Sequence, residues 1–182
     1  MQIRQAKIED CRAIAQVQVN SYRTAYANIF PPAYLAHFTY EEQEQDWRAW
    51  MNNPGNEMLL VAETTSGEIV GYALGRILDN RAYAGELVAL HVRRANQHQG
   101  IGSQLIAATA GELRQCGCAS LMLQTLAQNP SRSLYEKLGG QLVDEQPWVN
   151  NAEFGVNVTE VTYGWSDIAV LCRNARNRDE QQ

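Results

Sequence analysis

The sequence predicts an α/β protein: a mixed, mostly antiparallel sheet of six to seven strands, flanked by about four helices. Three observations lead to this fold class. The chain has 182 residues, 45% of them hydrophobic, which suffices for one domain with a sizeable core. Short apolar runs of strand length alternate with segments of helical periodicity. Near the middle, a strand, a helix and another strand follow one another, as in a βαβ crossover.

The N-terminal part is predicted to form one short strand followed by helices. Residues 3–6 fit the strand, and Glu9 and Asp10 stand where acidic residues favour a helix start. An aromatic-rich stretch follows, and Pro31-Pro32 divides it into two or more short helices. Its rings are Tyr22, Tyr26, Phe30, Tyr34, Phe38, Tyr40, Trp47 and Trp50. The turn-forming residues 52–55 close this region.

The remainder alternates strands with two further helices. The expected strands are Met58–Ala62, Ile69–Leu74, Leu87–Val92, Leu121–Leu126, residues 141–143 and Val158–Trp165. One helix is expected from Gly100 to Cys116, because apolar residues recur there at helical spacing. The second has Asn129 as its N-cap and Pro130 at its first position, and ends at residues 139–140.

Charge and composition exclude several classes of protein. The formal net charge is −5, whereas nucleic-acid binders carry a basic surface. The first ten residues are partly charged and lack an apolar segment, so we expect no signal peptide and a cytoplasmic location. No apolar run reaches the length of a membrane span. The four cysteines and three histidines match no ligand pattern, so we expect free thiols and no metal.

We expect a single domain over residues 1–166. Residues 167–182 are expected to form a C-terminal extension that is polar and partly disordered, because the segment from Asn174 to Gln182 is polar throughout.

The most informative segment is Leu90–Ser103, where a strand runs into a short loop that opens a helix at Gly100 and Gly102. Glycines allow a ligand to approach the backbone, and the first amides of a helix bind anions such as a pyrophosphate. Arg93, Arg94 and His98 would add positive charge at the rim of such a site. A plain strand-to-helix turn would show the same glycines. The segment does not match the fingerprint of dinucleotide-binding proteins, which requires a third glycine at position 105, where this chain has leucine. The sequence also contains no Walker A motif.

Three motifs of the chain resemble those of the GNAT acetyltransferases. Gln97-x-x-Gly100-x-Gly102 is similar to their Q/R-x-x-G-x-G/A signature. Leu90-His91-Val92 resembles their fourth strand, and Asn129 with Leu134–Gly139 resembles their N…LYEKLGF segment. The resemblance is specific over residues 86–140 and extends over 1–166 in the order of elements. Arg93 and Gly140 depart from it, standing where many members have a proline and an aromatic residue.

The resemblance implies a GNAT fold whose sheet splays apart between strands four and five, with acetyl-CoA bound in the gap. The backbone amides of Gln97, His98, Gln99, Gly100, Ile101, Gly102 and Ser103 would hold the pyrophosphate. The backbone of Leu90 and Val92 would pair with the pantetheine arm, and Asn129 would bind it from the other wall. A bulge near His91 would free an amide for the thioester oxygen.

The resemblance also implies catalytic roles. Tyr135 would protonate the departing thiolate as a general acid; otherwise it is a packed core tyrosine. Glu86 would be the general base, directly or through water, or else a solvated acid at the end of a strand. For His91 we favour a packed or solvated side chain over a catalytic one. Most of the aromatic stretch is expected to be core, with one or two rings lining an acceptor pocket.

The function so implied is transfer of an acetyl group from acetyl-CoA to a primary amine, of a small molecule or a protein, by direct attack in a ternary complex. No metal and no covalent acetyl-cysteine are expected. Besides acetyl-CoA and the amine, a second copy of the chain is a possible partner; nucleic acid and membranes are not. The rival hypothesis is a non-catalytic domain of the same fold that binds or senses acyl-CoA.

Overall fold

The computed structural model describes residues 1–79, 82–149 and 155–179. Its strands form one seven-stranded sheet in the order β1-β2-β3-β4-β5-β7-β6, which confirms the predicted mixed α/β fold. The strands are β1 (Gln2–Gln5), β2 (Glu57–Glu63), β3 (Ile69–Ile77), β4 (Gly85–Val92), β5 (Leu121–Leu126), β6 (Gln141–Pro147) and β7 (Thr159–Trp165). The β4–β5 pair is parallel and the other neighbouring pairs are antiparallel.

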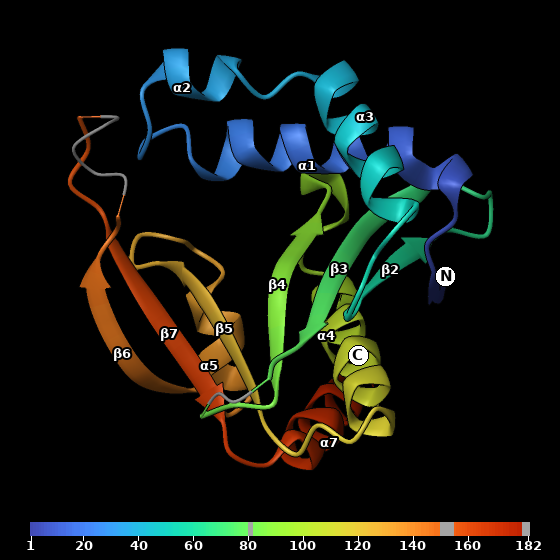
Figure 1. Ribbon diagram of the computed structural model, residues 1–182, viewed down its shortest axis with the longest axis vertical. Helices are drawn as coiled ribbons and strands as arrows, with labels where there is room; N and C mark the ends of the chain where they lie inside the picture. The colour runs from blue at the N-terminus through green and yellow to red at the C-terminus, as the bar shows by residue number, and fades with distance from the viewer. Residues whose placement is uncertain (80–81, 150–154, 180–182) are drawn as a thin grey trace.

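Helices cover both faces of the sheet (Figure 1). They are α1 (Cys11–Ala25), α2 (Pro32–Ala36), α3 (Tyr40–Met51), α4 (Ile101–Gln115), α5 (Arg132–Lys137) and α7 (Ile168–Asp179), with short 3-10 turns at Ile8–Asp10 and Arg94–Asn96. The start of α3 is capped by Thr39, whose hydroxyl accepts the amide of Glu42. Among the described residues, no helix is long and apolar enough to cross a membrane.

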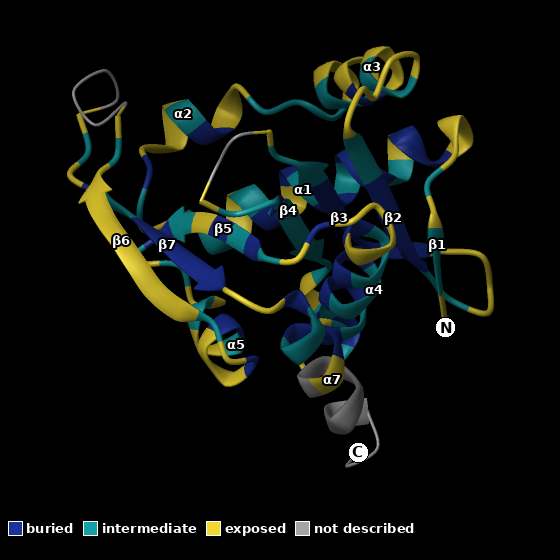
Figure 2. Cartoon of the chain, turned by 60° about the horizontal axis from the view of Figure 1, so that its bottom comes forward, coloured by how far each residue is buried: buried dark blue, intermediate teal, exposed yellow. Residues whose placement is uncertain are grey.

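The two faces of the sheet bury separate cores because successive side chains of a strand point to opposite sides. On β2, Leu60 and Ala62 belong to the core beneath α4 and α7. Leu59 and Val61 belong to the core beneath α1 and α3. Figure 2 shows that β3 and β7 are among the most buried strands, that β4 is mostly intermediate, and that β6, at the edge, is exposed along its whole length.

The C-terminal segment corrects the expected domain boundary. Residues 167–182 were predicted to be a polar extension, but Ile168, Leu171 and Cys172 are buried in the core beneath α4. Asp167 explains the helix: its carboxylate accepts the amide of Ala169 at 2.8 Å, as an N-cap does. The packed domain therefore continues past residue 166, while residues 180–182 lie outside the described part of the chain.

Strands β4 and β5 pair only at their beginnings. Gly85 lies opposite Leu121 and Glu86 opposite Met122, and beyond these two positions the strands have no register partners on each other. In Figure 1 the two strands diverge from there into a V, with α1 and α2 above its wide end. This divergence is the feature of the fold that creates the site.

Candidate active site

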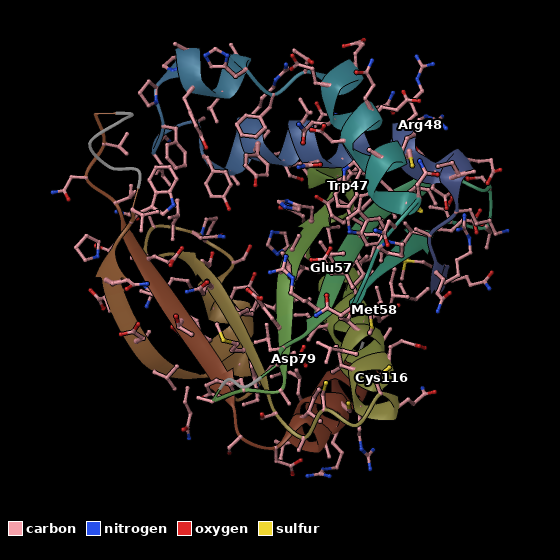
Figure 3. All side chains as sticks on the ribbon, in the orientation of Figure 1. Trp47, Arg48, Glu57, Met58, Asp79 and Cys116 are labelled. Carbon is pink, nitrogen blue, oxygen red and sulfur yellow. The ribbon has the colours of Figure 1, made fainter. Side chains whose placement is uncertain are left out.

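A cavity of about 240 Å³ occupies the V between β4 and β5. Its walls are Leu87–His91 of β4, Leu123–Leu126 of β5 and Tyr135 of α5. Rings from the first two helices and the loop between them complete it: Tyr22, Tyr26, Phe30 and Tyr34. Figure 3 shows side chains of α1 and α2 pointing down toward the two strands. The site therefore combines a strand edge, a tyrosine from α5 and an aromatic roof.

The β4 wall contains a bulge, but not where the sequence predicted it. Ala89 lies opposite Leu74 and Leu87 opposite Gly75, so Val88 has no register partner on β3. It has none on β5 either, because the strands have already separated. His91 continues the regular pairing, opposite Tyr72, so the expected bulge near His91 lies three positions earlier. A bulge leaves backbone groups outside the ladder, and here it does so at the cavity wall.

The loop after β4 presents the start of α4 as an open anion site. Gly100 is the N-cap in the left-handed conformation (φ 80°), and no side chain caps the helix. The first amides of α4 therefore keep their capacity for a ligand. His98 also has positive φ (63°), an uncommon conformation for a residue other than glycine. The side chain of Gln97 donates to the Val92 carbonyl at 3.0 Å, and that of Gln99 to Ala95 at 3.3 Å.

The side chains of Ile101 and Ser103 are buried, so over residues 101–103 it is the backbone that is left available to a ligand. Gly102 has a packing reason to be glycine. A Cβ there would lie 3.3 Å from Leu134 Cδ2 and 3.9 Å from Leu90 Cδ2. The helix start thus sits tightly between α5 and β4, next to the cavity.

Tyr135 is 5% exposed and lines the cavity. Burial raises the pKa of its hydroxyl to about 12, so the phenol is protonated at neutral pH. No hydrogen-bond partner for this hydroxyl occurs within the described part of the chain. Asn129 also lines the cavity, and its side chain is used locally: it donates to Thr125 Oγ1 at 2.8 Å and accepts the Ser131 amide at 2.9 Å.

Comparison with known proteins identifies the family. The model of the acetyltransferase (GNAT) family matches residues 19–140. The chain is 36% identical over 172 residues to an uncharacterised N-acetyltransferase, YuaI, of Bacillus subtilis, covering 93% of this chain and 95% of that protein. The chain belongs to the GNAT family of acetyltransferases.

Solved structures share its fold. The PaiA N-acetyltransferase from Thermoplasma acidophilum, solved with coenzyme A, has a TM-score of 0.69 at 21% identity, with 87% of this chain and 96% of that one covered. YncA from Salmonella typhimurium, a putative acetyltransferase solved with acetyl-CoA, also has a TM-score of 0.69, at 23% identity, with 91% and 92% covered. These likenesses confirm the GNAT fold, and membership of the family makes the chain an acyltransferase.

Of the two predicted catalytic residues of this GNAT domain, Tyr135 lines the cavity and Glu86 does not. Glu86 lies at the last paired position of β4 and β5, and its carboxylate forms an ion pair with Arg76 at 3.4 Å. The same guanidinium also binds Glu57 of β2, a residue labelled in Figure 3. The family pattern correctly placed Glu86 at the start of β4. The sequence analysis did not predict its ion pair with Arg76.

His91 lies on the α1 side of the sheet, between the rings of Tyr22 and Tyr72, whose centroids are 5.5 and 5.2 Å from its own. Burial lowers its pKa to about 4, so it is neutral at physiological pH. The His91 ring is thus packed against aromatic side chains, which agrees with the prediction of a packed rather than a catalytic side chain.

Among the residues of the cavity that the sequence analysis missed are Trp148 and Glu160. Both come from the C-terminal part of the chain, which has no family motif to mark them. Glu160 was detectable only as an acidic residue within the last expected strand. Among the described residues, no group of three or more His, Cys, Asp or Glu side chains is placed to hold a metal ion.

Proposed function

We propose that this GNAT acetyltransferase transfers the acetyl group of acetyl-CoA to a primary amine by direct attack within a ternary complex. The observation that carries the proposal is Tyr135, which lines the cavity in the V and whose hydroxyl is protonated and has no hydrogen-bond partner among the described residues. A protonated phenol there suits a general acid for the departing thiolate.

The binding groups fit acetyl-CoA, whose thioester supplies the activated acyl group. The uncapped start of α4, with the backbone of residues 97–103, suits its pyrophosphate. The edge of β4 that β5 leaves unpaired, including Leu90 and Val92, suits the extended pantetheine arm. Asn129 stands on the opposite wall.

Two further steps are stabilisation of the developing oxyanion and removal of the proton of the amine. The backbone around Val88, unpartnered on both sides, is the proposed donor to the developing oxyanion. Glu86 remains the proposed base. Because it lies beside Leu87 but outside the cavity lining, it would take the amine proton through water. The aromatic roof would limit the access of other water to the thioester.

The test is Tyr135→Phe, which keeps the ring and removes only the hydroxyl. We expect acetyl-CoA to bind normally in calorimetry, while the release of CoA thiol with an amine falls roughly 10²–10⁴-fold. Tyr72→Phe is the matched control, because Tyr72 is equally buried but lies outside the cavity lining. Wild-type turnover by Tyr135→Phe would rule out the acid role. Binding of acetyl-CoA without turnover by any variant, across a panel of amines, would favour the rival acyl-CoA-sensing domain.

A further inference from the structure

At the wide end of the V the cavity is lined by a carboxylate, that of Glu160. The start of β7 lies at this end, below α2 (Figure 1), and Glu160 is its second residue. Across the sheet it pairs with Leu126 of β5 and Gln146 of β6, so these three side chains share a face. Leu126 packs in the cluster with Phe30. The carboxylate is therefore on the aromatic side of the cavity, and it lines that cavity.

The Glu160 carboxylate is held by hydrogen bonds from two side-chain amides, and none of the ion pairs of the described residues includes it. Its Oε1 accepts hydrogen bonds from two neutral amides, Gln124 Nε2 at 3.1 Å and Gln146 Nε2 at 3.3 Å. The ion pairs of the described residues do not include Glu160. A negative charge fixed in this way at a cavity wall favours a cationic ligand group.

Aromatic rings surround the same end. Phe30 lies 4.6 Å from Tyr34, 5.2 Å from Trp148 and 5.9 Å from Tyr26, measured between ring centroids. Ring faces attract cations, most strongly where water is excluded. His91, being neutral, adds no opposing charge. Of the described residues that line the cavity, Glu160 is the one carboxylate, and none is a lysine or an arginine.

We propose that Glu160 and the surrounding rings form a subsite for a second positive charge on the acceptor, so that the substrate is a diamine-type molecule. This inference rests on the proposed function. The amine that attacks the thioester must be neutral when it reacts, so it gains nothing from a fixed carboxylate at that moment. A carboxylate at the far side of the acceptor pocket instead selects a group that stays charged throughout, and it orients the reacting end toward Tyr135 and β4.

The experiment compares two amines of equal chain length, hexamethylenediamine and hexylamine, with CoA release as the readout. In the wild type we expect kcat/KM for the diamine to exceed that for the monoamine by at least about tenfold, equivalent to ~1.4 kcal/mol. Glu160→Gln keeps an oxygen for the two amide donors and removes the charge. It should abolish the preference mainly by raising KM for the diamine, with a much smaller effect on KM for hexylamine.

Glu145→Gln is the matched control. Glu145 is exposed, precedes Gln146 on β6 and therefore points to the other face of the strand. It should keep the preference for the diamine. Equal kcat/KM for the two amines in the wild type, or an unchanged preference in Glu160→Gln, would overturn the subsite while the proposed function stands.

A binding measurement distinguishes failure of the proposed function from failure of the proposed subsite. If the wild type acetylates neither of these amines nor any other of the panel, the proposed function fails, and calorimetry on the protein saturated with acetyl-CoA decides the subsite. Hexamethylenediamine should then bind the wild type and Glu145→Gln but bind Glu160→Gln at least about tenfold more weakly. Equal binding to all three proteins would overturn the subsite. Thermal midpoints establish that the variants are folded.

Discussion

At the scale of single residues, Gly102 connects the packing of α4 to ligand binding. A valine there would push against Leu134 and Leu90, beside the free edge of β4. We expect Gly102→Val to weaken acetyl-CoA binding by at least about tenfold, or ~1.4 kcal/mol. Gly111→Val is the control, because it makes the same change in the same helix where a Cβ has open space. Equal affinity of both variants in calorimetry would contradict this role of Gly102.

His91 makes stability depend on pH. Burial lowers its pKa to about 4 in the folded state, against about 6.5 unfolded. Between these values the unfolded chain binds the proton and the folded chain does not, so stability falls as pH decreases from about 6.5 toward 4. From pH 7 to pH 5 this should remove on the order of 1–2 kcal/mol, allowing for the partial exposure of the ring.

Urea unfolding at the two pH values checks this prediction. His91→Gln should lose less stability than the wild type between pH 7 and pH 5. His98→Gln, which alters an exposed histidine, should lose as much as the wild type. If all three proteins respond alike, the His91 ring is solvated and does not carry the effect.

Gly140 shows how the chain compensates for a departure from its family. Many members have an aromatic residue at this position. Here a Cβ would lie 2.6 Å from Trp165 Cζ2 and 2.9 Å from the Tyr135 carbonyl. The Trp165 ring, buried and donating to the Leu138 carbonyl at 3.1 Å, occupies the space that a side chain at 140 would need. The missing ring is therefore replaced from β7.

At the scale of elements, α7 is part of the core and not a tail. Leu171 is fully buried against the core beneath α4. Leu171→Ala should lower the free energy of unfolding by about 2–5 kcal/mol, as is typical for truncating a buried leucine. Val170→Ala, on the partly exposed side of the same helix, should cost clearly less. If Leu171→Ala were as stable as the wild type, α7 would not be part of the core, as the sequence had predicted for a C-terminal extension.

At the scale of the whole molecule, the V is the open part of an otherwise continuous sheet. A ligand between β4 and β5 would satisfy backbone groups that the strands do not offer each other. Saturating acetyl-CoA should therefore slow amide hydrogen exchange in Leu87–Val92 and at the start of α4, and leave β1 at the far edge unchanged.

The ligand should also stabilise the domain globally, by about 2.7 kcal/mol at a concentration 100 times Kd. Mass spectrometry of exchanged peptides measures the first effect and thermal unfolding the second. Protection confined to segments outside the V would place the coenzyme elsewhere.

The sequence by itself determined most of the elements and part of the candidate site. The pattern of hydrophobic residues located β2, β3, β4, α4 and β5. An element that buries one face places its apolar residues at a regular spacing, and this spacing can be recognised in the sequence alone. The motifs pointed to the start of α4 and to Tyr135 as parts of the candidate site, because backbone access and a fixed offset along a helix are local properties. The bulge was placed three residues too late, since register depends on the partner strand.

Only the tertiary structure decided which distant residues share the cavity. Glu160 and Trp148 reach it because β7 lies between β5 and β6, a neighbour relation that no local pattern encodes. Arg76 holds Glu86 because β3 runs beside β4. In the same way α7 is a helix of the core because α4 offers an apolar surface to its few apolar residues, so its stability comes from packing and not from its own composition.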